Sequence, residues 1–159
     1  MRIAVAVEYG FSPSFPMPLT EERLLLAESV ALVIEVKSDL NKQWHQIEET
    51  TRKVKVLKRT LKAVTIEGDD PPPLSIPVIA VGYNGYSTIE GLSKRLESTP
   101  LECRPDGALV IDSGCFVGLG MTTSGALGLY ALTLGIDVLL RQLITSRPNL
   151  VRYARYSDF

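Results

Sequence analysis

The stretch from Val30 to Leu40, VALVIEVKSDL, constrains the fold of this chain more than any other. Its first seven residues are apolar or β-branched except for Glu35, a composition typical of a central strand buried on both faces. Side chains alternate between the two faces of a strand, so Glu35 and Lys37 point to the same side. Burying a carboxylate and an ammonium group is costly unless they are paired or bind a ligand. The strand is therefore predicted either to open onto a cleft here or to hold two groups that compensate each other.

The rest of the chain alternates strands with helices. Strands are predicted at residues 3–8, 30–36 and 76–83, and a fourth strand region at 107–117 contains a turn at 112–114. One amphipathic helix, capped by Ser38 or Asp39, is predicted from residue 40 to about 61. A helix capped by Ser87 follows at 88–98, and an apolar helix at 129–146 ends before Pro148. This order predicts an α/β domain in which a mixed central sheet is flanked by helices.

Length and composition are those of one ordinary globular domain, which we take as residues 1–159. The net charge of −1 gives no overall electrostatic reason to bind nucleic acid, although a local basic face remains open. Cys103 and Cys115 are typical of reduced thiols and not of a disulfide framework. The apolar start, residues 1–7, is too short for a signal peptide, and glycines and Asp137 interrupt the apolar stretch 125–140. We therefore expect a cytoplasmic protein without a membrane span.

Glu35 and Lys37 together are a pair that a metal-dependent phosphodiesterase would use. The carboxylate would hold Mg²⁺ through oxygen, and the lysine would stabilise charge developing on the phosphate. Their place at the carboxyl end of a strand, where α/β sheets often bind ligands, favours this interpretation. The alternative is a partly exposed ion pair near a strand end that contributes little.

The same stretch resembles the PD-(D/E)XK nuclease superfamily, whose fold is restriction-endonuclease-like. The similarity is to an uncharacterised bacterial branch with an E-V-K-[ST]-x-L strand, and PVIAVGY at 77–83 and GALVIDSGCFV at 107–117 also resemble that branch. The resemblance implies that Glu35 is a metal-ligating acid, that Lys37 is the catalytic lysine, and that the carbonyl group of Val36 completes part of the metal shell. It further implies Mg²⁺ or Mn²⁺ as cofactor, DNA as substrate, and a role in phage defence or mobile-element biology.

The chain departs from the superfamily pattern on its first strand. A further Asp is expected there, but Arg2 or Ala4 occupies the expected face and Glu8, at the far end, is the acid that the strand offers. The helix and strand that usually come before are absent, so the expected core is truncated at its N-terminus. Glu28 is a second candidate for the missing acid, with a strand-edge charge as the plainer interpretation. The alternative function is accordingly a catalytically inactive relative that binds nucleic acid or protein as a regulator, or a chain that borrows an acid from a second copy.

The first helix has a basic second half. We predict that Lys53, Lys55, Lys58 and Arg59 contact the DNA backbone, the alternative being a solvated face balanced by neighbouring glutamates. Its inward side is predicted to carry Trp44, Ile47, Val54 and Leu57. The lone histidine, His45, has no nucleophile beside it in the sequence and is weak evidence for acid–base chemistry.

The last helix, residues 129–146, is apolar nearly all round, which predicts burial. It is either the core helix of the second sheet face or half of a dimer interface. Because the usual first helix is absent, we expect a homodimer.

Overall fold

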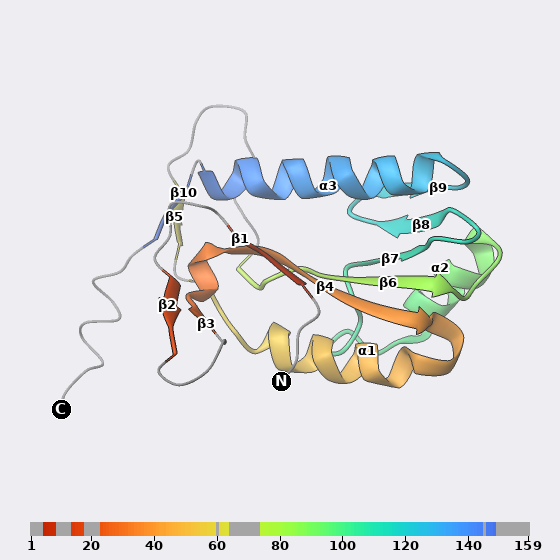
Figure 1. The fold of residues 1–159 in the computed structure, drawn as a ribbon, viewed down its shortest axis with the longest axis horizontal. Coiled ribbons are helices and arrows are strands. Elements are labelled where there is room, and N and C mark those ends of the chain that lie inside the picture. Colours follow the sequence, from red (N-terminus) through yellow and green to blue (C-terminus); the bar gives the residue numbers. More distant parts are fainter. Residues whose placement is uncertain are drawn as a thin grey trace.

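A six-stranded mixed sheet forms the centre of the structure (Figure 1). This computed structural model describes residues 5–8, 14–17, 23–59, 61–63, 74–144 and 146–148. The strands lie in the order β1 (Val5–Glu8), β4 (Val30–Asp39), β6 (Val78–Asn84), β7 (Gly107–Val110), β8 (Cys115–Gly118) and β9 (Met121–Thr123). The three strands β4, β6 and β7 are parallel, whereas β1, β8 and β9 are antiparallel to their neighbours.

Helices cover both faces of this sheet. Helices α1 (Leu40–Lys55) and α2 (Ile89–Ser98) lie on one face and α3 (Leu127–Ile144) lies on the other, as Figure 1 shows. A short 3-10 helix, η1 (Ala27–Ser29), leads into β4. Two small antiparallel pairs stand apart from the sheet, β2 (Ser14–Pro16) with β3 (Arg23–Leu25) and β5 (Leu61–Ala63) with β10 (Ser146–Pro148). The predicted fold class, a mixed sheet flanked by helices, is confirmed.

Alternation along β4 divides the core in two. Leu32 packs with Leu109, Phe116 and Leu132 on the side of α3. Val33 points the other way and packs with Val54 of α1. Both sets are buried, so the near-continuous apolar run of β4 reflects a strand covered on both faces, as the sequence predicted.

Several predicted boundaries differ from the structure. β4 continues to Asp39, and α1 ends at Lys55, several residues before the predicted end at 61. Leu57 consequently lies outside the helix and is 44% exposed, so its predicted core position is wrong. The N-cap of α2 is Thr88 and not Ser87. In the region 107–117 the predicted turn is present and joins β7 to β8 as a hairpin. Residues 1–4, with Arg2 and Ala4, lie outside the described residues.

Helix α3 is buried on one side. Its inner side, with Leu132 and Leu139, packs in the core, whereas Tyr130 and Leu134 are exposed, so the prediction that this helix is buried all round is wrong. By length and composition α3 is also the one helix within the described residues that could cross a membrane. The homodimer expected from the sequence stays a prediction.

The start of α1 is fixed by its own side chains. The Asp39 carboxylate accepts hydrogen bonds from the backbone N–H groups of Asn41 (2.9 Å) and Lys42 (3.3 Å). In return, Gln43 Oε1 accepts from the backbone N–H of Asp39 (3.2 Å) and from the Ser38 hydroxyl (2.9 Å). Burial opposes ionisation of Asp39, but the hydrogen bonds and the charge of Lys42 outweigh it and hold the pKa below its ordinary value. The strand therefore turns into the helix immediately after the Glu35–Lys37 segment.

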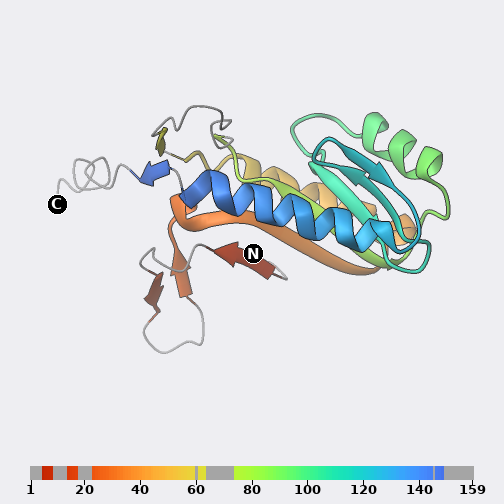
Figure 2. The ribbon, with the colours of Figure 1, turned by 90° about the horizontal axis from the view of Figure 1, so that it is seen from above.

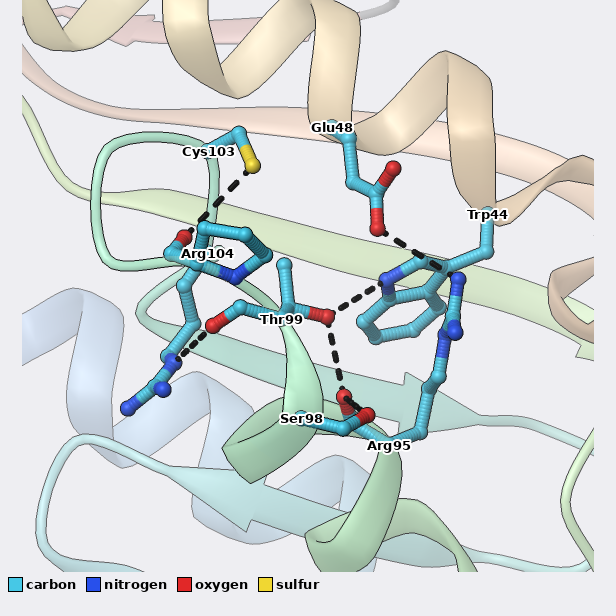
Figure 3. A network of polar contacts seen from close by, with 8 residues as sticks. Trp44, Glu48, Arg95, Ser98, Thr99, Cys103 and Arg104 are labelled. Atoms are coloured by element: carbon cyan, nitrogen blue, oxygen red, sulfur yellow. Dashed lines mark hydrogen bonds and ion pairs between the residues drawn. The ribbon is translucent and has the colours of Figure 1, made fainter.

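A polar network fastens α2 to α1 (Figure 3). The buried Trp44 indole donates to the Thr99 hydroxyl (3.0 Å), and the Arg95 guanidinium lies 5.3 Å from the centre of the Trp44 ring. Arg95 also donates to Glu48 of α1 at 3.3 Å. Arg104 donates to the carbonyl groups of Thr99 (2.8 Å) and Glu97 (2.7 Å) at the end of α2. These contacts hold both helices against one face of the sheet.

Candidate active site

Glu35 and Lys37 form an ion pair within the buried part of β4. Lys37 Nζ lies 2.6 Å from Glu35 Oε1, and the two side chains are 17% and 5% exposed, respectively. The second carboxylate oxygen, Glu35 Oε2, is buried and accepts no hydrogen bond from any described residue. A buried carboxylate oxygen without a donor is costly, and it is an oxygen that a cation or a bound water would satisfy.

The pair points to the side of the sheet that α1 covers. In the parallel ladder, Glu35 is opposite Ala80 and Lys37 is opposite Gly82 of β6. Laterally paired residues point to the same face, and Ala80 packs with Leu40, Trp44 and Ile47. Glu35 and Lys37 therefore lie on the face opposite to α3.

A glycine on β6, Gly82, makes room for the first residue of α1, Leu40. A Cβ added to Gly82 would lie 2.4 Å from Leu40 Cγ and 2.8 Å from the backbone oxygen of Asn84. Glycine at this position lets the first residue of α1 pack directly on the strand beside Lys37. Gly82 was not among the predicted site residues, although a glycine inside a strand pattern is the usual signal of such a close approach.

The other edge of the site is formed by β1. The described part of β1 begins at Val5, which is opposite Ile34, so β4 extends past it from Glu35 to Asp39. Arg2 and Ala4, which stand where the superfamily pattern expects an acid, lie outside the described residues. The predicted lack of a first-strand acid opposite Glu35 therefore stays a statement about the sequence.

Neither candidate for the missing acid lies beside Glu35. Glu8 is exposed and is paired with Val30, five positions from Glu35, or about 16 Å along the strand. Glu28 is buried in η1, before β4 begins, and does not lie on the strand with Glu35. This separation corrects the prediction that Glu8 or Glu28 completes a metal site with Glu35.

Arg59 also has a different place from the one predicted. Its side chain is buried, and its Nη2 donates to the carbonyl groups of Val30 and of Ala31, the latter at 2.7 Å. Burial lowers the pKa of Arg59 to about 10, and the charge of Glu28 opposes that shift. Arg59 and Glu28 thus hold the start of β4, and Arg59 is not exposed for contact with DNA.

The predicted basic contacts divide among different roles. Lys53 is half exposed and pairs with Glu49, whose pKa it lowers by hydrogen bonding. Lys55 Nζ lies 2.5 Å from the carbonyl oxygen of Arg104 and 3.6 Å from Asp106, so it holds the turn before β7. Lys58 is exposed. His45 is exposed on α1, and Cys103 and Cys115 are buried free thiols.

The site offers part of a metal shell. Glu35 Oε2 and the carbonyl group of Val36 are oxygen donors of the kind that Mg²⁺ and Mn²⁺ bind. Across the described ranges, however, no group of three His, Cys, Asp or Glu side chains is placed to hold a metal ion. Further ligands would have to be water, a substrate phosphate or residues outside those ranges.

A Glu-x-Lys strand in a mixed sheet, followed by a helix and a parallel strand, is the restriction-endonuclease-like core of PD-(D/E)XK nucleases, and this chain has that fold. Solved structures with the same fold include forms of NucC. The chain is 19% identical to the cAAA-bound form of NucC from P. aeruginosa ATCC27853, with a TM-score of 0.67 over 97% of this chain and 70% of that one.

NucC from E. coli MS115-1 gives similar values. Its cAAA-bound form is 18% identical at a TM-score of 0.67 and its apo form 22% identical at 0.64, with 97% of this chain covered in both and 69% and 74% of the NucC chains. No protein-family model matches the sequence, and no curated protein matches it significantly. At this level of identity the comparison establishes the fold.

Proposed function

We propose that this chain is a nuclease-like domain that acts on DNA phosphodiesters with Mg²⁺ or Mn²⁺ at Glu35. The observation that supports it best is the buried Glu35 carboxylate, which has one oxygen paired with Lys37 and the other without a donor among the described residues. The fold that the chain shares with NucC is further support for a catalytic role of Glu35 and Lys37.

The residues of this chain divide the work as follows. Glu35 Oε2 and the Val36 carbonyl group would hold the metal, which would supply positive charge to a phosphate and a more acidic bound water. Lys37 pairs with Glu35 in the free protein and would be the cation available to a phosphate bound beside Glu35. There its ammonium group stabilises the negative charge that develops in the transition state.

DNA would approach on the side of α1. Lys53 and Lys58 are the two predicted contacts that are exposed, with Lys53 also paired with Glu49, and both could reach a phosphate backbone. Replacing Lys53 or Lys58 by Ala should weaken DNA binding equally for all sequences and reduce its salt dependence. Arg52→Ala, which changes another exposed cation on α1, is the matched comparison.

The second candidate is a catalytically inactive relative that binds nucleic acid or protein. It is favoured because, among the described residues, Glu8 and Glu28 lie at the other end of β4 and not beside Glu35. One carboxylate holds Mg²⁺ weakly, whereas an active nuclease site usually offers more. In this case the Glu35–Lys37 pair is a retained ion pair that no longer meets a metal.

Calorimetric titration of Mn²⁺ and Mg²⁺ into the wild type and Glu35→Gln separates the two. An active site predicts binding that Glu35→Gln abolishes, together with metal-dependent cleavage of double-stranded DNA that both Glu35→Gln and Lys37→Met lose. If neither protein releases or absorbs heat on metal addition and the wild type leaves DNA intact, the inactive relative is the better description. Lys42→Met, an exposed lysine that pairs with Asp39, is the control for loss of a cation near the site.

For the biological setting we propose a cytoplasmic role in phage defence or mobile-element biology. The support is the resemblance of the Glu35–Lys37 segment to the PD-(D/E)XK nucleases together with the fold shared with NucC, which has been solved with cAAA bound. A test is whether expression of the wild-type chain, and not of Glu35→Gln, lowers phage yield in a sensitive host.

A further inference from the structure

Two buried polar atoms in the layer between α1 and β4 have no hydrogen-bond partner among the described residues. One is Glu35 Oε2, and the other is the hydroxyl oxygen of Thr51, whose side chain is completely buried on the inner side of α1. Leaving such atoms without a partner is costly, so nearly all buried polar atoms in folded proteins are bonded to protein or to ordered water. One hydrogen-bonded link between these two atoms would satisfy both.

Thr51 lies level with Glu35. Helix α1 runs back along β4, as Figures 1 and 2 show, so its successive turns lie over successive residues of that strand. Ile47, one turn before Thr51, packs in the same cluster as the β6 residue opposite Glu35. Val54, one turn after Thr51, packs with Val33, two residues before Glu35. Because helical side chains lean toward the N-terminus of their helix, Thr51 faces the part of β4 that carries Glu35.

The Thr51 hydroxyl does not bond to its own helix. A threonine inside a helix can donate to the carbonyl group one turn earlier, and Thr133 of α3 donates in this way to Leu129 at 3.0 Å. Thr51 has no such bond with the carbonyl group of Ile47. Since its side chain is shielded from bulk solvent, the group that its hydroxyl meets must lie inside the layer that holds Glu35.

We propose that Thr51 is a positioning residue for Glu35 and donates to Oε2 through one buried water. The two side chains make no direct bond in the structure, and a water between a hydroxyl and a carboxylate bonds to both. Lys37 already holds the other oxygen, Oε1, at 2.6 Å. The carboxylate is thus held from both sides in one orientation.

This arrangement leaves room for a metal ligand. A carboxylate oxygen has two acceptor positions, so Glu35 Oε2 can accept the water-mediated bond and still bind a metal ion. Groups that orient a metal-binding side chain in this way typically change metal affinity when they are removed. The metal part of the inference rests on the proposed function, whereas the link between Thr51 and Glu35 does not.

The first test measures whether the Thr51 hydroxyl and the Glu35 carboxylate act together in the full chain without metal. Thr51→Val keeps the shape of the side chain and removes the hydroxyl. Urea unfolding followed by Trp44 fluorescence compares its effect in the wild type and in Glu35→Met/Lys37→Met, which replaces both members of the ion pair by apolar side chains. We expect the midpoint to fall by about 0.5–1 M in the wild type, and to stay unchanged or rise in the second background, where the acceptor is gone.

Thr50→Val is the matched control, because Thr50 is the neighbouring buried threonine and points about 100° away around the helix. Its effect on the midpoint should be the same in both backgrounds. A Thr51→Val midpoint equal to or above that of the wild type would overturn the proposal, as would an equal fall in both backgrounds.

Manganese binding gives a second readout, which a purely structural role of Thr51 would not move. In calorimetric titration of Mn²⁺, Thr51→Val should raise the Kd about 10–100-fold, while Thr51→Ser, which keeps the hydroxyl, should stay within about threefold of the wild type. An unchanged Kd in Thr51→Val would refute the positioning role. If the wild type binds no Mn²⁺, the proposed function fails, and the unfolding measurements alone confirm or overturn the link between Thr51 and Glu35.

Discussion

Replacing Arg59 by Met should destabilise the domain more than any other single loss of charge among the described residues. The guanidinium group is 3% exposed, donates to two carbonyl groups at the start of β4, and feels the charge of the buried Glu28. Met keeps most of the volume but removes this donor from the two carbonyl groups and the favourable charge interaction with Glu28. Removing one member of a buried, interacting pair of charges costs about 3–5 kcal/mol.

Urea unfolding followed by Trp44 fluorescence measures this loss, since Trp44 is the single tryptophan and is buried. With a slope of about 2 kcal/mol per molar urea, the midpoint should fall by about 2 M. Arg52→Met is the matched control on the exposed side of α1 and should stay within about 0.5 kcal/mol of the wild type. Adding Glu28→Gln to Arg59→Met should recover part of the loss. A fall below about 1 kcal/mol for Arg59→Met would refute the reasoning that this buried pair fixes the start of β4.

Three further changes probe the elements that position Glu35 and Lys37. Gly82→Ala should lower the free energy of unfolding by about 1–3 kcal/mol, because the new Cβ meets Leu40 and a backbone oxygen. Gly120→Ala is the comparison variant: its Cβ has open space around it, so its effect on stability reports backbone strain alone. Trp44→Phe should cost about 1–2 kcal/mol through the lost bond to Thr99 and the weakened contact with Arg95, measured by thermal unfolding; an unchanged Tm would contradict the role of this network. Asp39→Ala should lower the stability of the domain by removing the N-cap hydrogen bonds to Asn41 and Lys42. Since the folded pKa of Asp39 lies below 3.8, that cap is present above pH 4 and should be lost as pH falls through the folded pKa, so wild type and variant should converge in acid.

The element order could be read from the sequence because hydrophobic periodicity is local. The run Val30–Val36 predicted a buried strand, the 3.6-residue pattern after Asp39 predicted α1, and alternation of strands with helices predicted a mixed sheet covered on both faces. Ends were less well predicted: the basic segment 56–61 resembles a helix in composition, but α1 stops at Lys55, and Arg59 turns inward to β4.

The candidate site was half predictable for the same reason. Glu35 and Lys37 are two residues apart, so strand alternation alone places them on one face, and the structure adds their ion pair of 2.6 Å. The partner acid was not predictable, because it depends on which residue of another strand comes beside Glu35. The register of β1 moves Glu8 to the opposite end of β4, and η1 moves Glu28 to Arg59.

The sequence by itself determined the order of the main strands and helices, and that one strand carries an acid and a lysine on the same side. Tertiary structure decided what those side chains meet: Ala80 and Gly82 beside the pair, Arg59 at the base of β4, and a sheet under one face of α3. The physical reason is that local periodicity depends on neighbours three or four residues away. Burial, pairing and exposure depend on residues that approach only when the sheet is assembled, and an apolar helix cannot by its own pattern specify which of its faces the sheet will cover.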